Sequence, residues 1–168
     1  VHPSDVAPAL VALNASFVVS GPAGERSLSA QEFFVLPSQN PQQENVLAPG
    51  ELLSGVNIPS APSNTVSTYH KIMDREAWTH AEVSVAAVLT LAGNRVEAAS
   101  IVLGGVATIP WKLDAVESFL VGKELTEAVV REAGALAVAD AQPLTKNGHK
   151  VPMTSAAVER TLISLASA

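Results

Sequence analysis

The sequence has no cysteine, few aromatic residues and few charged ones. Of its 168 residues none is Cys, 4% are aromatic and 15% are charged. Without Cys the chain cannot form a disulfide, a zinc–thiolate site, an iron–sulfur cluster of its own or a thiol nucleophile. Hydrophobic residues make up 48% of the chain, so the core must consist mainly of Ala, Val and Leu side chains.

Long apolar runs and clusters of basic residues are also missing. No stretch approaches the ~20 consecutive apolar residues that cross a bilayer, so we expect no membrane-spanning segment. The 10 basic and 16 acidic residues give a net charge of −6, and the basic residues do not cluster. We therefore expect no nucleic-acid partner.

No familiar constellation of catalytic or metal-binding residues is present. The four His residues lie far apart, with no pair at the spacing of a metal site. Neither a nucleophile elbow nor a P-loop occurs. We expect no metal site and no acid–base or nucleophilic catalytic residue, and nothing supports an independent hydrolase or metal enzyme.

The first 59 residues predict helices and strands separated by polar turns. The segment 5–13 has apolar residues at helical spacing after Ser4 or Asp5 as N-cap. Ser29 and Glu32 have the spacing of a capping box. The other expected elements are strands over 15–20, 25–28 and 52–58, and a loop over 37–49. The polar linker 59–64 predicts a domain boundary.

The pattern beyond that linker favours strands first and helices afterwards. Strands are expected over 65–73, 83–91 and 96–103, the last two joined as a hairpin by a turn that contains Gly93-Asn94. Helices are expected from Leu113 to Leu120, over 126–139, and after an N-cap at Thr154 or Ser155. This order predicts an α+β domain whose three-stranded antiparallel sheet is covered on one face by three helices.

The segment 69–80 concentrates polar and aromatic side chains beside an apolar strand. It contains two cations, two imidazoles, a phenol and an indole. Such a segment is commonly a solvated edge strand with an exposed loop. The alternative is a binding site for a flat, electron-rich ligand, because it offers planar stacking, hydrogen bonds and a fixed positive charge.

Several short motifs follow one another along the chain. The first begins Ser4-Asp5-Val6-Ala7-Pro8-Ala9-Leu10 and has the form SDxxPALxALxA. The others are 51–59, 71–75, 83–86, 103–112, 120–122 and 141–151. In this order they resemble the FAD-binding medium subunit of molybdenum hydroxylases, the family of xanthine dehydrogenases, carbon monoxide dehydrogenases and aldehyde oxidoreductases, and the last motif is most similar to periplasmic aldehyde oxidoreductases. The resemblance covers essentially the whole chain.

The resemblance implies a fold, a cofactor and partners. Residues 1–59 would be the C-terminal part of the FAD-binding domain, and residues 60–168 a small C-terminal domain with a three-stranded sheet and three helices. FAD would receive electrons from iron–sulfur clusters on one partner subunit and pass them to an acceptor. The molybdenum cofactor, where substrate is hydroxylated, would lie on another partner.

The resemblance also implies roles for individual residues. Asp5 would accept hydrogen bonds from the polar part of the flavin, although capping of the helix is an equal alternative. Leu53 would pack beside the isoalloxazine ring, or simply be a core residue. Lys71 would place a positive charge near the ring, or be a surface lysine. Tyr69 and Trp78 are candidate aromatic neighbours of the ring, and for Trp78 we favour instead a hydrophobic anchor of its loop.

The family's glycine-rich segments, which bind the pyrophosphate, are not in this sequence. The chain starts at Val1 and is similar to about the C-terminal half of the subunit, so we expect it to bind FAD weakly or not at all by itself and to be inactive alone. The alternative function is a non-enzymatic assembly module that docks partner subunits without binding flavin. The compartment stays open between the cytoplasm and a periplasm reached by export with a partner.

Overall fold

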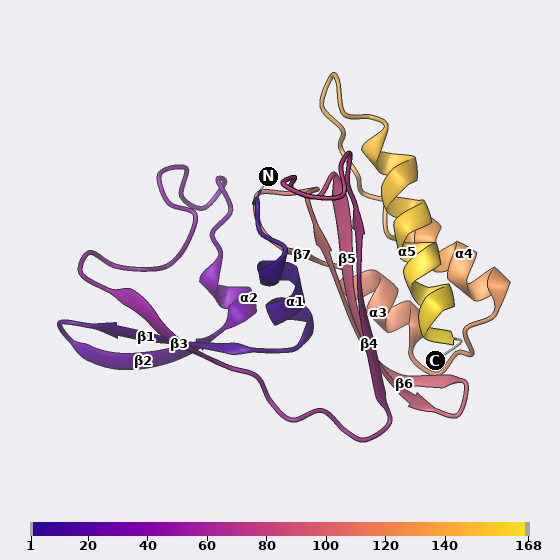
Figure 1. Ribbon diagram of the computed structural model, residues 1–168, viewed down its shortest axis with the longest axis horizontal. Helices are drawn as coiled ribbons and strands as arrows, with labels where there is room; N and C mark the ends of the chain where they lie inside the picture. The colour runs from indigo at the N-terminus through magenta and orange to yellow at the C-terminus, as the bar shows by residue number, and fades with distance from the viewer. Residues whose placement is uncertain (1, 167–168) are drawn as a thin grey trace.

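The computed structural model describes residues 2–166, which form two antiparallel sheets and five helices (Figure 1). The expected α+β class is confirmed. Within these residues no helix is both long enough and apolar enough to cross a membrane.

The first sheet has the strand order β2-β1-β3. Its strands are β1 (Ser16–Gly21), β2 (Gly24–Ser29) and β3 (Leu52–Asn57), and its helices are α1 (Val6–Ala12) and α2 (Ala30–Phe33). The capping box before α2 is confirmed, because the Glu32 amide donates to Ser29 Oγ and the Ser29 amide donates to Glu32 Oε2. These elements agree with the sequence-based expectations to within about two residues.

The second sheet has the order β4-β5-β6-β7. Its strands are β4 (Thr65–Ile72), β5 (Val83–Ala92), β6 (Arg95–Gly104) and β7 (Trp111–Lys112), and it is followed by α3 (Asp114–Leu120), α4 (Glu127–Leu136) and α5 (Lys150–Ala166). The sequence predicts three strands for this sheet, whereas the structure has four, so the predicted number is wrong. Strand β7 has only two residues, which is too short to show the alternation that reveals a strand.

Helix α5 begins at Lys150, so the N-cap expected at Thr154 or Ser155 is also wrong. Pro152 lies in the first turn of α5, where the missing N–H of proline removes no helical hydrogen bond. Thr154 is instead a buried residue of the second turn, with 4% of its surface exposed.

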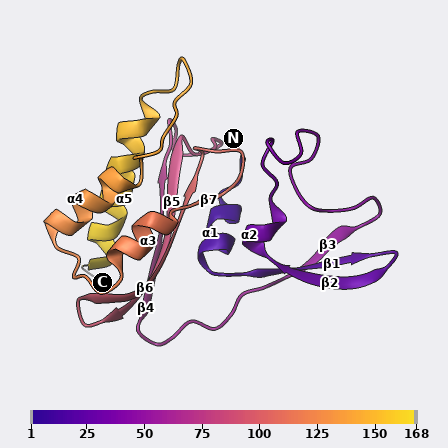
Figure 2. The same cartoon turned by 180° about the vertical axis from the view of Figure 1, so that it is seen from behind.

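The second sheet is covered on both faces, not on one as the sequence predicts. Figures 1 and 2 show α3, α4 and α5 on one side of it and α1 on the other. The face beneath α3, α4 and α5 carries Val83, Val85 and Leu89 of β5. On the opposite face, Ala86 and Val102 belong to a second core with Val11 of α1. This second core, completed by Phe17 and Phe33, joins the two sheets.

An ion pair holds the loop between α2 and β3 against the first sheet. Arg26 Nε donates to Glu51 Oε1 at 2.9 Å and Nη2 donates to Oε2 at 2.8 Å. The Ala48 amide also donates to Glu51 Oε2 at 2.8 Å. These bonds favour the carboxylate and lower the pKa of Glu51 from 4.5 to about 2, with the Arg26 hydrogen bonds as the largest cause.

We expect this attachment of the loop to persist at pH values far below the usual pKa of a Glu carboxyl. Because the folded pKa is the lower one, the stabilisation is fully present above pH 4.5 and is lost as the pH falls through about 2. An NMR titration of the Glu51 carboxyl should give that low midpoint in the unmodified chain and a midpoint raised towards 4.5 in Arg26→Met. Titration of Glu51 near 4.5 in the unmodified chain would contradict the prediction.

Candidate functional site

Asp5 precedes helix α1, but its side chain makes no capping hydrogen bond to it. Ser4 does so instead, since the Ala7 amide donates to Ser4 Oγ at 3.1 Å. The alternative interpretation, that the Asp5 side chain caps α1, is therefore wrong. The Asp5 carboxylate is left to face the second sheet.

Tyr69 and Lys71 lie on the face of β4 that turns towards α1. Alternate residues of a strand share a face, so their side chains point the same way. Lys71 Nζ donates to Asp5 Oδ2 at 2.7 Å, and the Tyr69 hydroxyl donates to Asp5 Oδ1 at 3.1 Å. We call these three residues the Asp5 cluster. Asp5 thereby contacts one residue that lies 64 positions later in the sequence and another that lies 66 positions later.

Hydrogen bonds and burial shift the pKa values of two residues of the Asp5 cluster. The Lys71 hydrogen bond, with a smaller one from Tyr69, lowers the pKa of Asp5. Burial raises the pKa of Tyr69, and the neighbouring Asp5 carboxylate adds to that effect. At neutral pH the cluster therefore consists of a carboxylate, an ammonium and a neutral phenol.

The cluster is partly accessible to solvent, mainly at Asp5. The Asp5 side chain is 44% exposed and that of Lys71 is 18% exposed. A carboxylate has about four lone-pair sites, so Asp5 can accept further hydrogen bonds from a ligand while it holds Tyr69 and Lys71. An ion pair this exposed adds little to stability.

Gly104 allows α1 to lie close enough for the cluster to form. A Cβ at residue 104 would be 2.9 Å from Cγ of Pro8 and would also collide with Oγ of Ser84. The chain turns sharply at the next residue, Gly105, where φ is +76°. The packing of Pro8 on Gly104 was missed, because nothing in the local sequence pairs the two residues.

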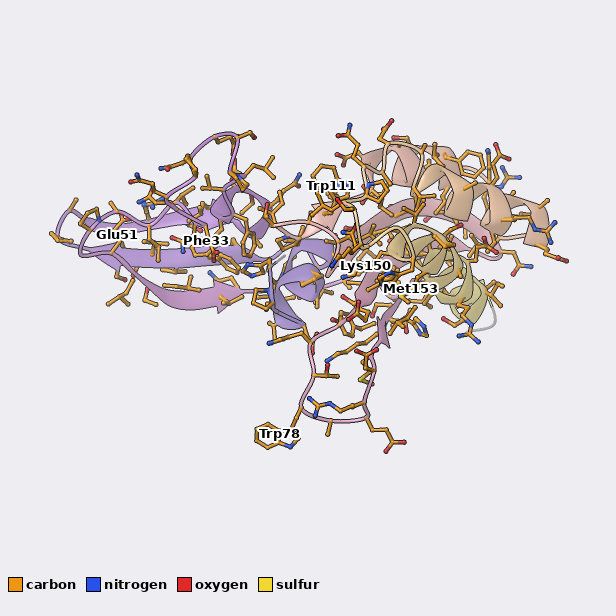
Figure 3. All side chains as sticks on the ribbon, turned by 90° about the horizontal axis from the view of Figure 1, so that it is seen from above. Phe33, Glu51, Trp78, Trp111, Lys150 and Met153 are labelled. Atoms are coloured by element: carbon orange, nitrogen blue, oxygen red, sulfur yellow. The ribbon has the colours of Figure 1, made fainter. Side chains whose placement is uncertain are left out.

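The loop over 73–82 connects β4 to β5 and carries Trp78 at its tip (Figure 3). Lys71 Nζ donates to the Thr79 carbonyl at 2.8 Å, and Arg75 Nη2 donates to the Trp78 carbonyl at 2.7 Å. Trp78 has a φ of +59° and is 95% exposed. It does not anchor its loop, so the interpretation that we favoured for Trp78 is wrong.

Leu53 lies apart from the Asp5 cluster, in the first sheet. It pairs with Val19 of β1 and is 40% exposed, so it is not a core residue. Other apolar side chains of the same segment are exposed with it, namely Leu52, Val56 and Ile58. The structure thus brings together Asp5, Tyr69 and Lys71, and places Leu53 and Trp78 on separate exposed surfaces.

The described residues offer no group of three or more His, Cys, Asp or Glu side chains that could hold a metal ion. The groups available to a ligand are a carboxylate, a phenol, an ammonium and exposed apolar side chains. Such a set suits an organic ligand that has hydroxyl donors and an aromatic ring.

Two family models match the sequence. Residues 1–61 match the FAD binding domain in molybdopterin dehydrogenase, and residues 68–162 match the CO dehydrogenase flavoprotein C-terminal domain. The second match alone covers more than half of the chain.

Relatives and solved structures agree with these matches. The aldehyde oxidoreductase FAD-binding subunit PaoB of Escherichia coli is 34% identical over 98% of this chain and 47% of its own length. The glyceraldehyde dehydrogenase medium chain of Sulfolobus acidocaldarius is 32% identical over 77% of this chain and 43% of its own. A carbon monoxide dehydrogenase structure from Hydrogenophaga pseudoflava, which lacks the Mo-pyranopterin moiety of the molybdenum cofactor, superposes with a TM-score of 0.86 at 26% identity.

That superposition covers 97% of this chain and 59% of the other. The chain spans about half the length of the curated relatives it matches. With two family models in sequence along it, the chain belongs to the FAD-binding medium subunits of the molybdenum hydroxylases.

Proposed function

We propose that this chain forms one side of a flavin site in a molybdenum-containing hydroxylase complex. In this proposal residues 1–59 belong to the FAD-binding domain and residues 60–168 form the C-terminal domain. A partner subunit supplies electrons from iron–sulfur clusters, and another holds the molybdenum cofactor. Bound FAD would supply the ability to collect these electrons and pass them to an acceptor.

One observation carries the proposal: the Asp5 cluster joins the two parts of the chain at an accessible point. Asp5 comes from the first part, and Tyr69 and Lys71 come from the second. A ligand that lies between the two parts can therefore contact a carboxylate and an ammonium at once. The Asp5 carboxylate suits hydroxyl donors, and the Lys71 ammonium suits a ring that gains negative charge.

The apolar part of such a ligand has candidate neighbours on both parts. Leu53 exposes an aliphatic side chain on β3, and Trp78 exposes an indole on the loop after β4. An extended molecule such as FAD is long enough to contact elements that do not contact each other. We therefore retain Leu53 and Trp78 as proposed flavin neighbours, together with the three residues of the Asp5 cluster.

The phosphates need a different kind of surface from the Asp5 cluster. They bind best where several backbone N–H groups converge, as at a glycine-rich turn that opens a helix. The resemblance assigns those turns to the half of the relatives that this chain does not span. We propose that the pyrophosphate is bound there, so that both halves together hold FAD.

Replacing Asp5 by Asn tests the proposed hydroxyl contact. The variant keeps the size of the side chain but loses the charge that strengthens its hydrogen bonds. We expect the subunit that includes this chain to bind FAD about tenfold more weakly, a loss of about 1.4 kcal/mol, in an absorbance titration.

Asp114→Asn is the matched control for that experiment. Asp114 also accepts a hydrogen bond from a lysine, Lys112, at 2.7 Å, but it lies at the start of α3. FAD affinity should be unchanged by this substitution. Equal weakening by both substitutions, or none by Asp5→Asn, would leave the Asp5 contact without support.

A further inference from the structure

One end of the second sheet gathers three segments around the ammonium of Lys150. Lys150 is the first residue of α5, which covers the sheet on the side away from α1 (Figures 1 and 2). Its Nζ donates to the Glu82 carbonyl at 2.9 Å and to the Gly105 carbonyl at 3.0 Å. Because Glu82 directly precedes β5 and Gly105 directly follows β6, Lys150 joins two strand ends to the start of α5.

The contacts of Lys150 differ from those of an ordinary surface lysine. Its side chain is only 20% exposed, and Nζ also lies 3.4 Å from Glu82 Oε2. Two of the three N–H groups of the ammonium are taken by backbone carbonyls. A charged donor makes a hydrogen bond about twice as strong as a neutral donor does. The ammonium therefore fixes two backbone segments relative to each other, besides balancing the charge of a carboxylate.

Glu82 ends the loop 73–82, and this loop is also attached to the Asp5 cluster. The Glu82 amide donates back to the carbonyl of the last residue of β4 at 2.8 Å, which closes the base of the loop. Further along the loop, the Thr79 carbonyl accepts a hydrogen bond from Lys71 Nζ at 2.8 Å. Lys71 is therefore held between the carboxylate of the cluster and a loop whose base is held by Lys150.

Gly105 begins a second connection from Lys150 to the Asp5 cluster. Two residues after Gly105, the Ala107 carbonyl accepts a hydrogen bond from the His2 amide at 3.0 Å. His2 is close in sequence to Asp5, so this bond holds the segment that carries the carboxylate. The same ammonium thus lies at the start of two backbone connections, one to the lysine of the cluster and one to its carboxylate.

We propose that Lys150 is a positioning residue for the Asp5 cluster, and that it acts through the base of loop 73–82 on the place of Lys71. This inference rests on the proposed function, which assigns the cluster to flavin binding. Lys150 lies on the α5 side of the sheet, away from the cluster, so it acts through the backbone. Without its ammonium, the carbonyls of Glu82 and Gly105 lose this charged donor, and the loop that contacts Lys71 gains freedom.

Hydrogen exchange at the Glu82 amide measures the hold of Lys150 on the loop without any flavin. In Lys150→Met this amide should exchange at least about fivefold faster, because fewer contacts oppose opening of the loop base. Lys150→Arg keeps a charged donor and should restore slow exchange. Lys112→Met is the matched control, since Lys112 is 21% exposed but pairs with carboxylates of α3. It should change exchange at Glu82 by less than about twofold.

FAD binding by the subunit that includes this chain tests the action of Lys150 on the cluster. Lys150→Met should weaken FAD about threefold in an absorbance titration, and Lys150→Arg should restore the affinity. In a Lys71→Met background, Lys150→Met should cause little further loss, because the side chain through which it acts is gone. A merely structural role of Lys150 would give the same loss in both backgrounds.

The outcomes separate this inference from the proposed function. Unchanged exchange at Glu82 in Lys150→Met overturns the inference, and so do equal losses of FAD affinity with and without Lys71. If Lys150→Met leaves FAD affinity unchanged while Asp5→Asn lowers it, the inference alone fails. If neither substitution changes FAD affinity, the proposed function fails as well.

Discussion

Replacing Lys71 by Met should lower the midpoint potential of the flavin in the subunit that contains this chain. In our proposal, the Lys71 ammonium stabilises the negative charge that reduction adds to the ring. Removal of the positive charge of Lys71 favours the oxidised flavin. We expect the midpoint potential to decrease by about 50 mV, or about 2.3 kcal/mol for a two-electron couple. Met keeps the aliphatic length of the side chain, so loss of packing should be small. A spectroscopic redox titration measures the effect.

Lys112→Met is the matched control for this substitution. Lys112 is also a half-buried lysine in contact with carboxylates, and although burial opposes it, the hydrogen bonds to Asp114 and Glu117 raise its pKa. It lies at β7, away from the Asp5 cluster, and should leave the flavin potential unchanged. An unchanged potential in Lys71→Met would remove Lys71 from the proposed ring contacts.

Replacing Gly105 by Ala should give the largest loss of stability among our predictions. Gly105 has a φ of +76°, which disfavours a side chain. A Cβ there would also be 2.7 Å from the carbonyl oxygen of Glu82 and 2.8 Å from that of Ala81. Backbone atoms cannot move aside as the end of a side chain can, and Lys150 holds the Gly105 and Glu82 carbonyls together. We expect unfolding in urea to become about 3 kcal/mol easier.

Gly93→Ala separates backbone conformation from steric conflict. Gly93 also has a positive φ, +59°, but a Cβ there would meet nothing within 4 Å. Its loss should be only about 1 kcal/mol. Equal losses at the two positions would contradict the role that we assign to the close approach at Gly105.

Local signals in the sequence were enough for most of the strands and helices. The Ser29–Glu32 capping box and the Gly93-Asn94 turn act over a few residues, so short-range physics determines them. The errors arise where a local signal is short or ambiguous. Strand β7 has too few residues to alternate, and Pro152 resembles a helix stop although it fits the first turn of α5.

The candidate site depends on contacts that no local pattern contains. The alternation of β4 places Tyr69 and Lys71 on one face, but their partner Asp5 is more than 60 positions away. The family resemblance supplied Asp5 and Lys71 as candidates, and the structure shows that they form an ion pair. Trp78 illustrates the opposite case, because an indole normally suggests burial, and only the three-dimensional structure places it at an exposed loop tip.

The most direct test is an absorbance titration of FAD with this chain, alone and together with the half of the subunit that its relatives possess and it does not span. If the chain supplies one side of a shared site, flavin should bind weakly or not at all to the chain alone and tightly to the two parts combined. Equal binding in both mixtures would contradict the account, as would an absence of binding in both, which would favour an assembly module without a flavin role.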